Sequence, residues 1–411
     1  MVLVRKQRVR VDPEKCRSCL VCVTVSACRS PERCIGCLAC FWACPYEARV
    51  VEEVEEEVGE VTIYVDGVAH RVPDGVTVAR ALESIGYSFR EPGHEPSLAC
   101  RTGGCWSCAL VIDGELERTC ITPVRDGMRI STDLAGATPR RIVHGPEPHT
   151  VGGKATPWWE VDYRRYVEAA IWTAGCDLRC PQCQNYAVTY DNVSPALTPR
   201  EAARAVAACH RLFNTRGVAV SGGEPTLNRR WILEFFREVT RLVGRGVRRH
   251  LDSNGTLLTP DYIDELVEAG CNNIGVEPKC VRPDTYARIT GLDDLELARK
   301  YLERAWRAVE YIYDNYREEV YLGVGLVYNP KLVSLEELIE AGRRIASIGE
   351  EIQVTVLDYF PAFRRRDIKR PSVRDMLRVK RALEEVGLKT VVVQTRIGHF
   401  GPGNRRAGLL H

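Results

Sequence analysis

Three cysteines with close, uneven spacing are the residues of this chain best suited to chemistry. Cys176, Cys180 and Cys183 are separated by three residues and then by two. Three thiolates can hold three irons of a [4Fe–4S] cluster, which leaves the fourth iron without a protein ligand. An open position on a metal is where an outside ligand binds and reacts. A zinc knuckle is the alternative, but zinc needs four ligands and no fourth Cys or His stands nearby in the sequence.

A second short motif, Gly222-Gly223-Glu224-Pro225, follows an apolar run at 217–221. The cysteines follow another apolar run at 167–173. Both runs are typical of buried strands. We therefore expect both motifs at the carboxyl ends of strands, where α/β barrels place their chemistry.

The cysteine spacing after one strand and the Gly-Gly-Glu-Pro motif after the next together resemble the radical S-adenosylmethionine (SAM) superfamily, over roughly residues 165–397. The wider stretch 175–185 looks most like the branch related to pyruvate formate-lyase activating enzymes. The resemblance implies an enzyme that reductively cleaves SAM to a 5′-deoxyadenosyl radical, which then abstracts hydrogen from a protein or small-molecule substrate. Cys176, Cys180 and Cys183 would be its catalytic cluster ligands.

The same resemblance implies a set of SAM contacts, namely Gly222, Gly223, Glu224, Pro225, Asn254, Glu277 and Lys279. Asn254 is equally consistent with an ordinary Asn-Gly turn, and Glu277 and Lys279 with surface charges. Gln182 departs from the branch, which usually has an apolar or aromatic residue near adenine there, and Tyr186 is a possible substitute. Tyr359 stands where some activating enzymes carry a histidine.

The first 58 residues contain two runs of cysteines that resemble two-cluster bacterial ferredoxins. In those proteins the fourth Cys of each run ligates the other cluster. By that resemblance one [4Fe–4S] cluster is held by Cys16, Cys19, Cys22 and Cys44, and a second by Cys28, Cys34, Cys37 and Cys40. Five residues rather than three separate Cys22 from Cys28, so the geometry of the second cluster is the open point. Zinc ribbons are the alternative.

A third set of cysteines has the spacing of plant-type [2Fe–2S] ferredoxins, C-x4-C-x2-C and a later Cys. The predicted ligands are Cys100, Cys105, Cys108 and Cys120. The gap before Cys120 is similar to that of the β-grasp ferredoxin domains of succinate and xanthine dehydrogenases. Trp106 stands where that family usually has glycine. With one cluster at Cys176, the chain would hold three [4Fe–4S] clusters, one [2Fe–2S] cluster and SAM.

The region that must position the catalytic motifs alternates strands and helices, which predicts parallel βα units. We expect strands at 168–173, 217–221, 247–252, 273–277, 320–327, 352–357 and 389–394, with helices at 199–213, 228–243, 260–269, 294–317, 334–348 and 372–386. The predicted fold is α/β, a partial (βα)6 TIM-like barrel preceded by two small α+β ferredoxin domains. The predicted divisions are 1–58, 59–135, a linker at 136–159, the barrel at 160–397 and a basic tail at 398–411.

Composition limits the partners and the cellular compartment expected for this protein. The formal net charge is +2, so the chain has no strong field for nucleic acid, and no apolar run approaches the roughly 20 residues of a membrane span. Fifteen of the 18 cysteines have cluster spacings, and such thiolates need a reducing compartment, so we expect a cytoplasmic protein. Of the three that are left over, Cys209 and Cys271 are expected to be buried structural thiols, and Cys280 has no assigned role. Few Met and many Arg indicate a thermophile, which a melting temperature below about 60 °C would contradict.

Some charged and histidine residues are expected to face solvent and to take no part in the site. The basic cluster Arg364-Arg365-Arg366 is predicted to lie on a solvated face, and His144 and His149 to face solvent in the linker. Two different functions remain open at this point. The first is a radical SAM enzyme with a built-in electron relay, to which an external low-potential donor could supply electrons. The second is an iron–sulfur electron-transfer subunit without SAM chemistry.

Overall fold

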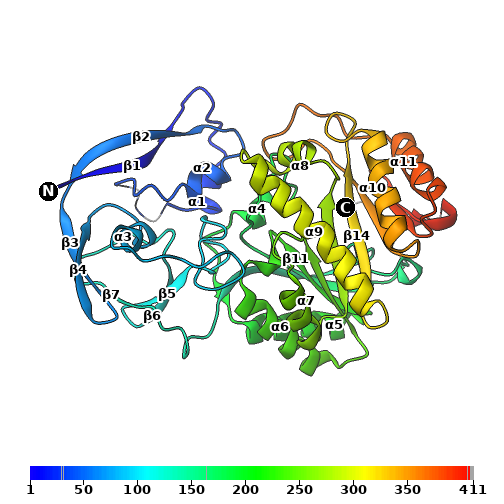
Figure 1. Ribbon diagram of the computed structural model, residues 1–411, viewed down its shortest axis with the longest axis horizontal. Helices are drawn as coiled ribbons and strands as arrows, with labels where there is room; N and C mark the ends of the chain where they lie inside the picture. Colours follow the sequence, from blue (N-terminus) through cyan, green and yellow to red (C-terminus); the bar gives the residue numbers. More distant parts are fainter. Residues whose placement is uncertain (29, 31, 163, 405, 408–411) are drawn as a thin grey trace.

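The computed structural model describes residues 1–28, 30, 32–162, 164–404 and 406–407. Two small units from the N-terminal third of the chain lie beside one large α/β unit (Figure 1). None of the helices in the described residues is long and apolar enough to cross a bilayer.

The first small unit is a long two-stranded ribbon that encloses two short helices. β1 (Val2–Val11) pairs antiparallel with β2 (Arg49–Val58), and α1 (Val21–Thr24) and α2 (Ala39–Ala43) lie in the connection between them. The acidic run that begins at Glu52 forms β2 because β1 opposite is basic. Arg10 pairs with Glu52, and Lys6 pairs with Glu56. Both pairs are diagonal neighbours across the ribbon, and opposite charges in such positions stabilise it.

The second small unit is a five-stranded sheet with one helix. Its strand order is β4-β3-β7-β5-β6, in which β3 and β7 are parallel and the other pairs are antiparallel. The elements are β3 (Glu60–Val65), β4 (Val68–Pro73), α3 (Val78–Ser84), β5 (Ala109–Ile112), β6 (Glu115–Arg118) and β7 (Arg129–Ser131). Thr77 caps α3, and the helix packs its buried Leu82 against Ile63 and Leu110 of the sheet.

The large unit confirms the α/β fold. Seven parallel strands are hydrogen-bonded in chain order: β9 (Glu168–Thr173), β11 (Gly217–Gly222), β12 (Arg248–Ser253), β13 (Asn273–Lys279), β14 (Tyr321–Tyr328), β15 (Gln353–Asp358) and β16 (Val391–Thr395). The helices between them are α5 (Pro199–Phe213), α6 (Arg229–Val243), α7 (Pro260–Glu268), α8 (Pro283–Thr290), α9 (Leu295–Tyr316), α10 (Leu335–Ile348) and α11 (Val373–Glu385). The predicted strands and helices agree with these bounds within two residues, and α8 and the short α4 (Tyr186–Thr189) are additional helices.

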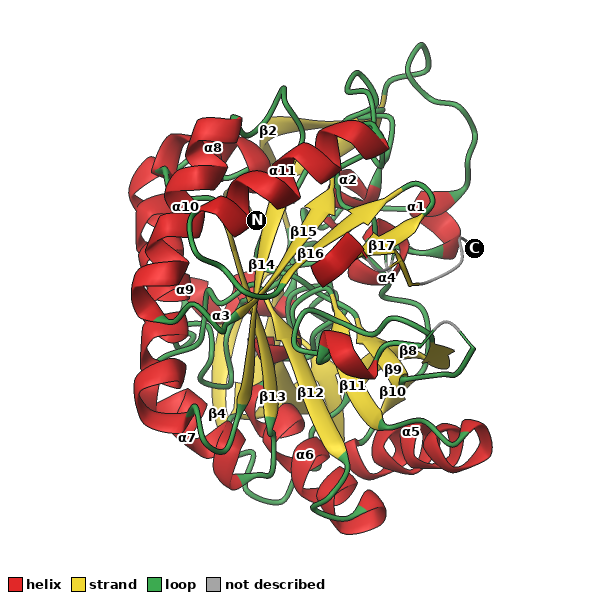
Figure 2. Cartoon of the chain, turned by 90° about the vertical axis from the view of Figure 1, so that its right-hand side faces the viewer, coloured by secondary structure: helices red, strands yellow, loops and turns green. Residues whose placement is uncertain are grey.

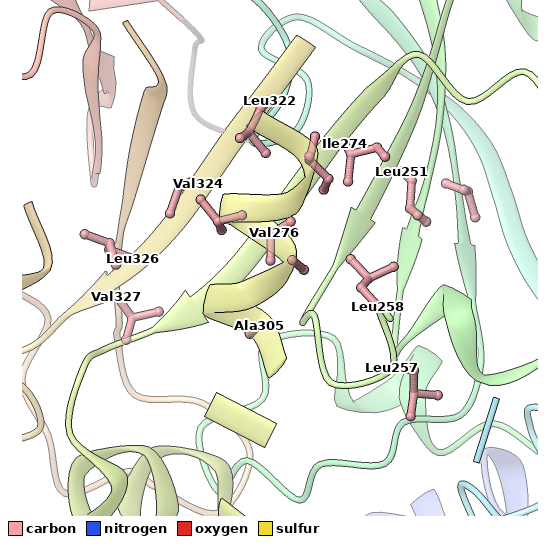
Figure 3. Close-up of a cluster of buried hydrophobic side chains, with 14 of the residues drawn as sticks. Leu251, Leu257, Leu258, Ile274, Val276, Ala305, Leu322, Val324, Leu326 and Val327 are labelled. Atoms are coloured by element: carbon pink, nitrogen blue, oxygen red, sulfur yellow. The ribbon is translucent and has the colours of Figure 1, made fainter. Parts of the chain in front are cut away.

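The helices cover the outer face of the curved sheet (Figure 2). Alternate strand residues point outward into this layer. Figure 3 shows Ile274 and Val276 of β13 and Leu322 and Val324 of β14 beside Ala305 of α9, and all five are buried. The residues between them point to the other face of the sheet, because strand side chains alternate. Many of the residues that position the site therefore lie on this other face, which is the inner face of the curved sheet.

The predicted linker at 136–159 contains an unpredicted strand. β8 (Arg141–His149) runs antiparallel to β9 and also pairs with β10 (Ala196–Leu197). Gly145 and Pro146 interrupt its apolar pattern and lie at an irregularity in the pairing between His144 and Glu147, which is why the strand was not predicted. A 3-10 turn, Trp158–Glu160, follows.

At the other edge of the sheet, β17 (Gly398–Phe400) pairs antiparallel with β16 and with β18 (Arg406–Ala407). These strands lie in the segment predicted as a basic tail, of which residues 405 and 408–411 are outside the described residues. In the described part of the chain β9 and β16 do not pair with each other, so the barrel is partial and open.

Candidate active site

The three central cysteines lie in one cavity at the carboxyl ends of the parallel strands. Cys176, Cys180 and Cys183 line it together with Gly222, Gly223, Asn254, Glu277 and Lys279, so the structure brings these predicted site residues together. Within the described residues no fourth Cys and no His lines this cavity. Three thiols and an open side are the donor set that a [4Fe–4S] cluster with one open iron requires.

Burial raises the pKa of all three thiols. Burial raises the pKa of Cys180 to about 12, and it also raises the pKa of Cys176 and Cys183. The free thiols are therefore protonated, and a bound cation is what would stabilise their thiolates. The Leu178 backbone N–H donates to Cys176 Sγ at 3.4 Å. Similar backbone bonds reach Cys34, Cys44 and Cys100, and hydrogen bonds to sulfur tune cluster potentials.

The two glycines of the Gly-Gly-Glu-Pro motif are required by close backbone packing against the cysteine loop. A Cβ on Gly222 would lie 2.4 Å from Thr173 O, and one on Gly223 would lie 2.1 Å from Gly175 O. The Gly223 N–H donates to Thr173 O and the Glu224 N–H to Gly175 O, each at 2.8 Å. The motif is thus fastened directly to the start of the cysteine loop.

Glu224 holds two loops together inside the protein. Its side chain is fully buried and accepts from Thr226 Oγ1 at 2.6 Å, Ser253 Oγ at 2.9 Å and the Asn254 N–H at 2.7 Å. Burial, followed by the nearby Asp177, raises its pKa. The sequence suggested that this carboxylate orients the SAM amine. The structure shows it occupied by protein donors, so its contact with SAM stays a prediction.

Asn254 links the third strand to the cysteine loop. Its Nδ2 donates to Asp177 Oδ1 at 3.0 Å and lies 3.9 Å from Cys176 Sγ. Its Oδ1 accepts from the Thr256 N–H at 2.9 Å, which is the local bond of an Asx turn. Asn254 lines the cavity and also forms the turn, so the two alternatives for this residue describe the same arrangement.

Glu277 and Lys279 are not surface charges. Both are buried, and the Lys279 Nζ donates to Glu277. Burial alone would raise the pKa of Glu277, but Lys279 and Lys154 lower it below its ordinary value. Lys279 has a φ of 69°, in the left-handed region, and its Nζ lies 3.4 Å from Tyr359 Oη. Strained backbone of this kind is concentrated at functional sites.

Lys154 is a site residue that sequence reasoning missed. It lies in the segment 136–159 that was predicted to be a linker. Its Nζ lies 3.1 Å from Glu277 and 3.5 Å from Asp252. The segment at 152–156, which we call the inner segment, runs along the inner face of the sheet. Gly323 and Gly325 make room for it, since a Cβ on either would lie within 2.6 Å of Lys154 atoms. The Gly-Gly pair before Lys154 is the one signal in the sequence.

Side chains from several strands hold the inner segment. Gln353 Nε2 donates to the carbonyls of Lys154 and Thr156, both at 2.9 Å, and Asn273 Nδ2 donates to Ala155 O at 2.8 Å. A cavity of about 360 Å³ lies beside it and shares Lys154, Asn185, Ser221, Asp252 and Leu357 with the cysteine cavity. The two cavities therefore adjoin.

Gln182 lines the cysteine cavity and Tyr186 does not. Gln182 is 1% exposed, its Nε2 donates to Ile289 O at 2.8 Å, and its Oε1 has no hydrogen-bond partner among the described residues. Tyr186 instead stacks on Phe363, with ring centroids 4.8 Å apart. The geometry therefore favours Gln182 over Tyr186 as a neighbour of a bound ligand.

Cys28, Cys34, Cys37 and Cys40 lie near one another, and Arg49 lies near Cys22, Cys40 and Cys44. The electrostatic neighbours of Cys37 include Cys28 and Cys34, and those of Cys40 include Cys28, Cys34 and Cys37. Arg49 donates to Cys22 Sγ at 2.8 Å and also lies near Cys44. Their role as cluster ligands stays a prediction.

The four cysteines of the second unit are all buried, and their loop packs against the barrel. A Cβ on Gly104 would lie 2.8 Å from Gly175 N, and one on Gly175 would lie 2.7 Å from Cys105 Cβ. Trp106 has a φ of 61°, so it adopts the left-handed conformation that glycine favours at this place. Its ring packs under the Arg118 guanidinium, 4.7 Å from the centroid.

No three His, Cys, Asp or Glu side chains in the described residues meet closely enough to hold a single metal ion. A [4Fe–4S] cluster takes one thiolate on each iron and a [2Fe–2S] cluster takes two, so neither needs three side chains on a single ion, and this observation concerns other metals. Cys209 and Cys271 are buried as expected, and Cys280 is buried as well.

Two expectations about solvent-facing residues are wrong. Arg364 donates to the carbonyls of Phe41, Trp42 and Cys44, which end α2, at 2.6 to 3.1 Å. It thereby attaches the first unit to the barrel. His144 Nε2 lies 2.8 Å from Asp191 Oδ2 because β8 brings it beside the loop after α4 (Tyr186–Thr189). His149 packs on the Trp172 ring, with centroids 5.0 Å apart.

Comparison with known families agrees with this geometry. Residues 170–342 match the radical SAM superfamily, which includes the cysteine loop and the Gly-Gly-Glu-Pro motif. The chain carries a radical SAM domain. Residues 59–134 match a 2Fe-2S iron–sulfur cluster binding domain, and residues 28–50 match a 4Fe-4S binding domain. The recognition of a radical SAM domain behind N-terminal iron–sulfur units is confirmed.

Individual relatives match about a third of this chain. A GTP 3′,8-cyclase of Paracoccus denitrificans is 35% identical over 126 residues, which are 30% of this chain and 36% of that protein. A protein of Methanocaldococcus jannaschii named as a glycyl-radical enzyme activating enzyme is 28% identical over 133 residues, 31% of this chain and 48% of that protein. The matches thus span less than half of either relative.

Among solved structures, the Streptococcus suis SuiB crystal structure is similar with 15% identity and a TM-score of 0.42, over 54% of this chain and 47% of that chain.

Proposed function

We propose that this chain is a radical SAM enzyme with its own iron–sulfur electron supply. One observation carries the proposal. Three cysteine thiols, the two motif glycines and the buried Glu277–Lys279 pair line one cavity. The second unit packs against the start of the loop that carries the thiols, and Trp42 of the first unit lies against Arg179 of that loop.

A [4Fe–4S] cluster on Cys176, Cys180 and Cys183 would supply one electron to SAM, giving methionine and a 5′-deoxyadenosyl radical for hydrogen abstraction. The chain's own residues would bind SAM and orient it. Lys279 suits the SAM carboxylate, and Glu277, held ionised by two lysines, suits the amine or the ribose. The unpartnered Oε1 of Gln182 suits a hydrogen-bond donor such as the adenine amine.

The packing supports an order for the relay. Cys37 of the first unit contacts the hydrophobic cluster that contains Cys108 and Cys120, while Cys100 and Cys105 belong to the core of the barrel. A [2Fe–2S] cluster on those four thiols would therefore lie between a [4Fe–4S] cluster and the SAM site. The exposed Cys16, Cys19 and Cys28 leave the outermost thiols accessible to an external low-potential donor. Three [4Fe–4S] clusters and one [2Fe–2S] cluster are the proposed content.

The hydrogen donor would occupy the adjoining cavity beside the inner segment. Its volume of about 360 Å³ suits a small molecule or one side chain of a protein. The relatives include a cyclase that acts on a small molecule and an activating enzyme, so both substrate classes remain proposals. Fifteen thiols with cluster spacings favour a reducing, cytoplasmic setting.

The test is SAM cleavage by anaerobically reconstituted full-length protein. Reduction with dithionite in the presence of SAM is expected to yield 5′-deoxyadenosine, and the Cys176→Ala variant is expected to yield none. Cys271→Ala is the matched control, because Cys271 is a buried thiol outside the proposed cluster sets. Wild-type protein with intact clusters that neither binds nor cleaves SAM would overturn the proposal in favour of an electron-transfer subunit.

A further inference from the structure

Arg141 is a fully buried cation between the second iron–sulfur unit and the SAM site. It lies in β8 and is 0% exposed. Its guanidinium donates to Ala174 O at 2.9 Å, Glu224 O at 2.5 Å and Pro225 O at 2.5 Å. These carbonyls belong to the residue before the cysteine loop and to the Gly-Gly-Glu-Pro motif. The side chain thus fastens both SAM-site motifs at one point.

This cation has no carboxylate partner in the described residues. Every acceptor of the Arg141 guanidinium is a neutral backbone carbonyl, and no ion pair within 4 Å involves it. Burial lowers its pKa, and the negative charges that act against burial come from Cys105, then Glu224 and Cys100. A buried charge without a counter-charge is strongly unfavourable. The carboxylate of Glu224 is already occupied by Thr226, Ser253 and Asn254.

We propose that Arg141 is the fixed counter-charge of a [2Fe–2S] cluster on Cys100, Cys105, Cys108 and Cys120, and a positioning residue that joins this cluster to the SAM site. The inference rests on the proposed iron–sulfur content of the chain. A cluster held by four thiolates carries net negative charge, which increases by one unit on reduction. A nearby permanent cation stabilises the reduced form more than the oxidised form. Arg141 therefore raises the reduction potential of the cluster.

The geometry also explains why the cation is an arginine in β8. The Ile142 N–H donates to Gly104 O at 3.4 Å, and Asn228 Nδ2 donates to Cys105 O at 3.1 Å. The strand thus lies directly between the loop of the buried cysteines and the barrel. Arg141 reaches the three carbonyls with all three nitrogens of its planar guanidinium, a spread of donors that the single nitrogen of an ammonium group cannot reproduce.

Two substitutions separate charge from hydrogen bonding. Arg141→Gln keeps amide donors for the carbonyls and removes the charge, whereas Arg141→Lys keeps the charge and loses part of the bonding. Arg140→Gln is the matched control, because Arg140 is the adjacent, exposed arginine. The measurement is a redox titration of the [2Fe–2S] signal by electron paramagnetic resonance on the full-length holoprotein. It requires no SAM cleavage.

We expect Arg141→Gln to shift the reduction equilibrium toward the oxidised cluster by about tenfold, which is about 59 mV for one electron. Arg141→Lys and Arg140→Gln are expected to stay close to wild type. Equal potentials in wild type and Arg141→Gln, or equal shifts in the Gln and Lys variants, would overturn the inference. A wild-type protein that forms no [2Fe–2S] cluster would also overturn it, while SAM cleavage could persist. If Arg141→Gln does not fold, the Arg141→Lys titration decides, because a tenfold shift there contradicts a role of charge.

Discussion

The two N-terminal iron–sulfur units are joined to the radical SAM domain in different ways. The first has exposed thiols at Cys16, Cys19 and Cys28, and Arg364 attaches it through the carbonyls at the end of α2. The second buries all four of its thiols, and Cys100 and Cys105 are members of the same hydrophobic core as the barrel strands. The first unit is docked on the barrel, whereas the second is part of its interior. Four pairs of substitutions compare the docked first unit with the interior of the molecule or probe one of the two attachments.

Loss of one buried ligand should have the largest effect. Cys105→Ala is expected to abolish the [2Fe–2S] signal, lower the melting temperature by about 5 °C or more, and disturb SAM cleavage, because cluster binding is coupled to folding of the shared core. Cys19→Ala is the matched change in the first unit and is expected to leave dithionite-driven cleavage within about twofold of wild type. Absorbance, calorimetry and a 5′-deoxyadenosine assay measure these effects. Equal losses in the two variants would show that the units are equally integrated.

Crowding the contact between the second unit and the cysteine loop should reduce stability by a smaller amount. A Cβ on Gly104 would lie 2.8 Å from Ala174 Cβ, Asp191 O and Gly175 N. We expect Gly104→Val to destabilise the protein by about 3 kcal/mol through overpacking. Gly136→Val is the control, since nothing lies within 4 Å of a Cβ there. Similar thermal stability of the two variants would contradict tight packing at this contact.

Buried charge along the inner segment should make stability depend on pH. Burial alone would lower the pKa of His250, but Asp252 and Glu168 raise it to about 9. Because the folded pKa lies above the ordinary value, this stabilisation is fully present below about pH 6.5 and is lost as pH rises toward about 9. His250→Gln should cost on the order of 2 kcal/mol at pH 6 and much less at pH 10.

The comparison for this variant is an exposed ion pair of the docked unit. Arg5 and Glu53 have side chains that are 72% and 58% exposed. Arg5→Gln should change stability by less than about 0.5 kcal/mol at either pH, because exposed pairs contribute little. Melting temperatures of all three proteins at both pH values measure the difference. A His250→Gln effect that does not shrink at high pH would exclude a protonated His250 as its cause.

The smallest effect is expected at the attachment of the first unit. Arg364→Ala removes hydrogen bonds to Phe41, Trp42 and Cys44 and a contact with the Phe363 ring, worth about 1 kcal/mol together at this partly exposed site. Hydrogen exchange should rise in residues 1–58 and stay unchanged in the barrel. Arg374→Ala, an exposed arginine on α11, is the control. Faster exchange throughout the barrel would show that the first unit is not simply docked.

Short-range patterns account for what could be predicted from the sequence. The cysteine spacings marked the three sets of thiols, and the alternation of strand and helix patterns marked the βα units of the barrel. Contacts between distant segments could not be predicted. Arg141, Lys154 and Arg364 meet partners more than 80 residues away in sequence, and no local pattern distinguishes them from solvated charges. Trp106 shows the same limit, because nothing near it in sequence indicates a left-handed backbone.

The route of the inner segment has a practical consequence for anyone who wishes to excise the barrel. A fragment that begins at 160, the predicted start of the barrel, would leave behind Lys154 and the strand β8 that covers the edge of β9. Such a truncated protein would expose glycine-lined backbone at 323 and 325 and would leave Glu277 with one lysine partner instead of two and Asp252 with none. The smallest autonomous catalytic piece therefore has to begin upstream of Arg141, within reach of the ferredoxin fold that precedes it.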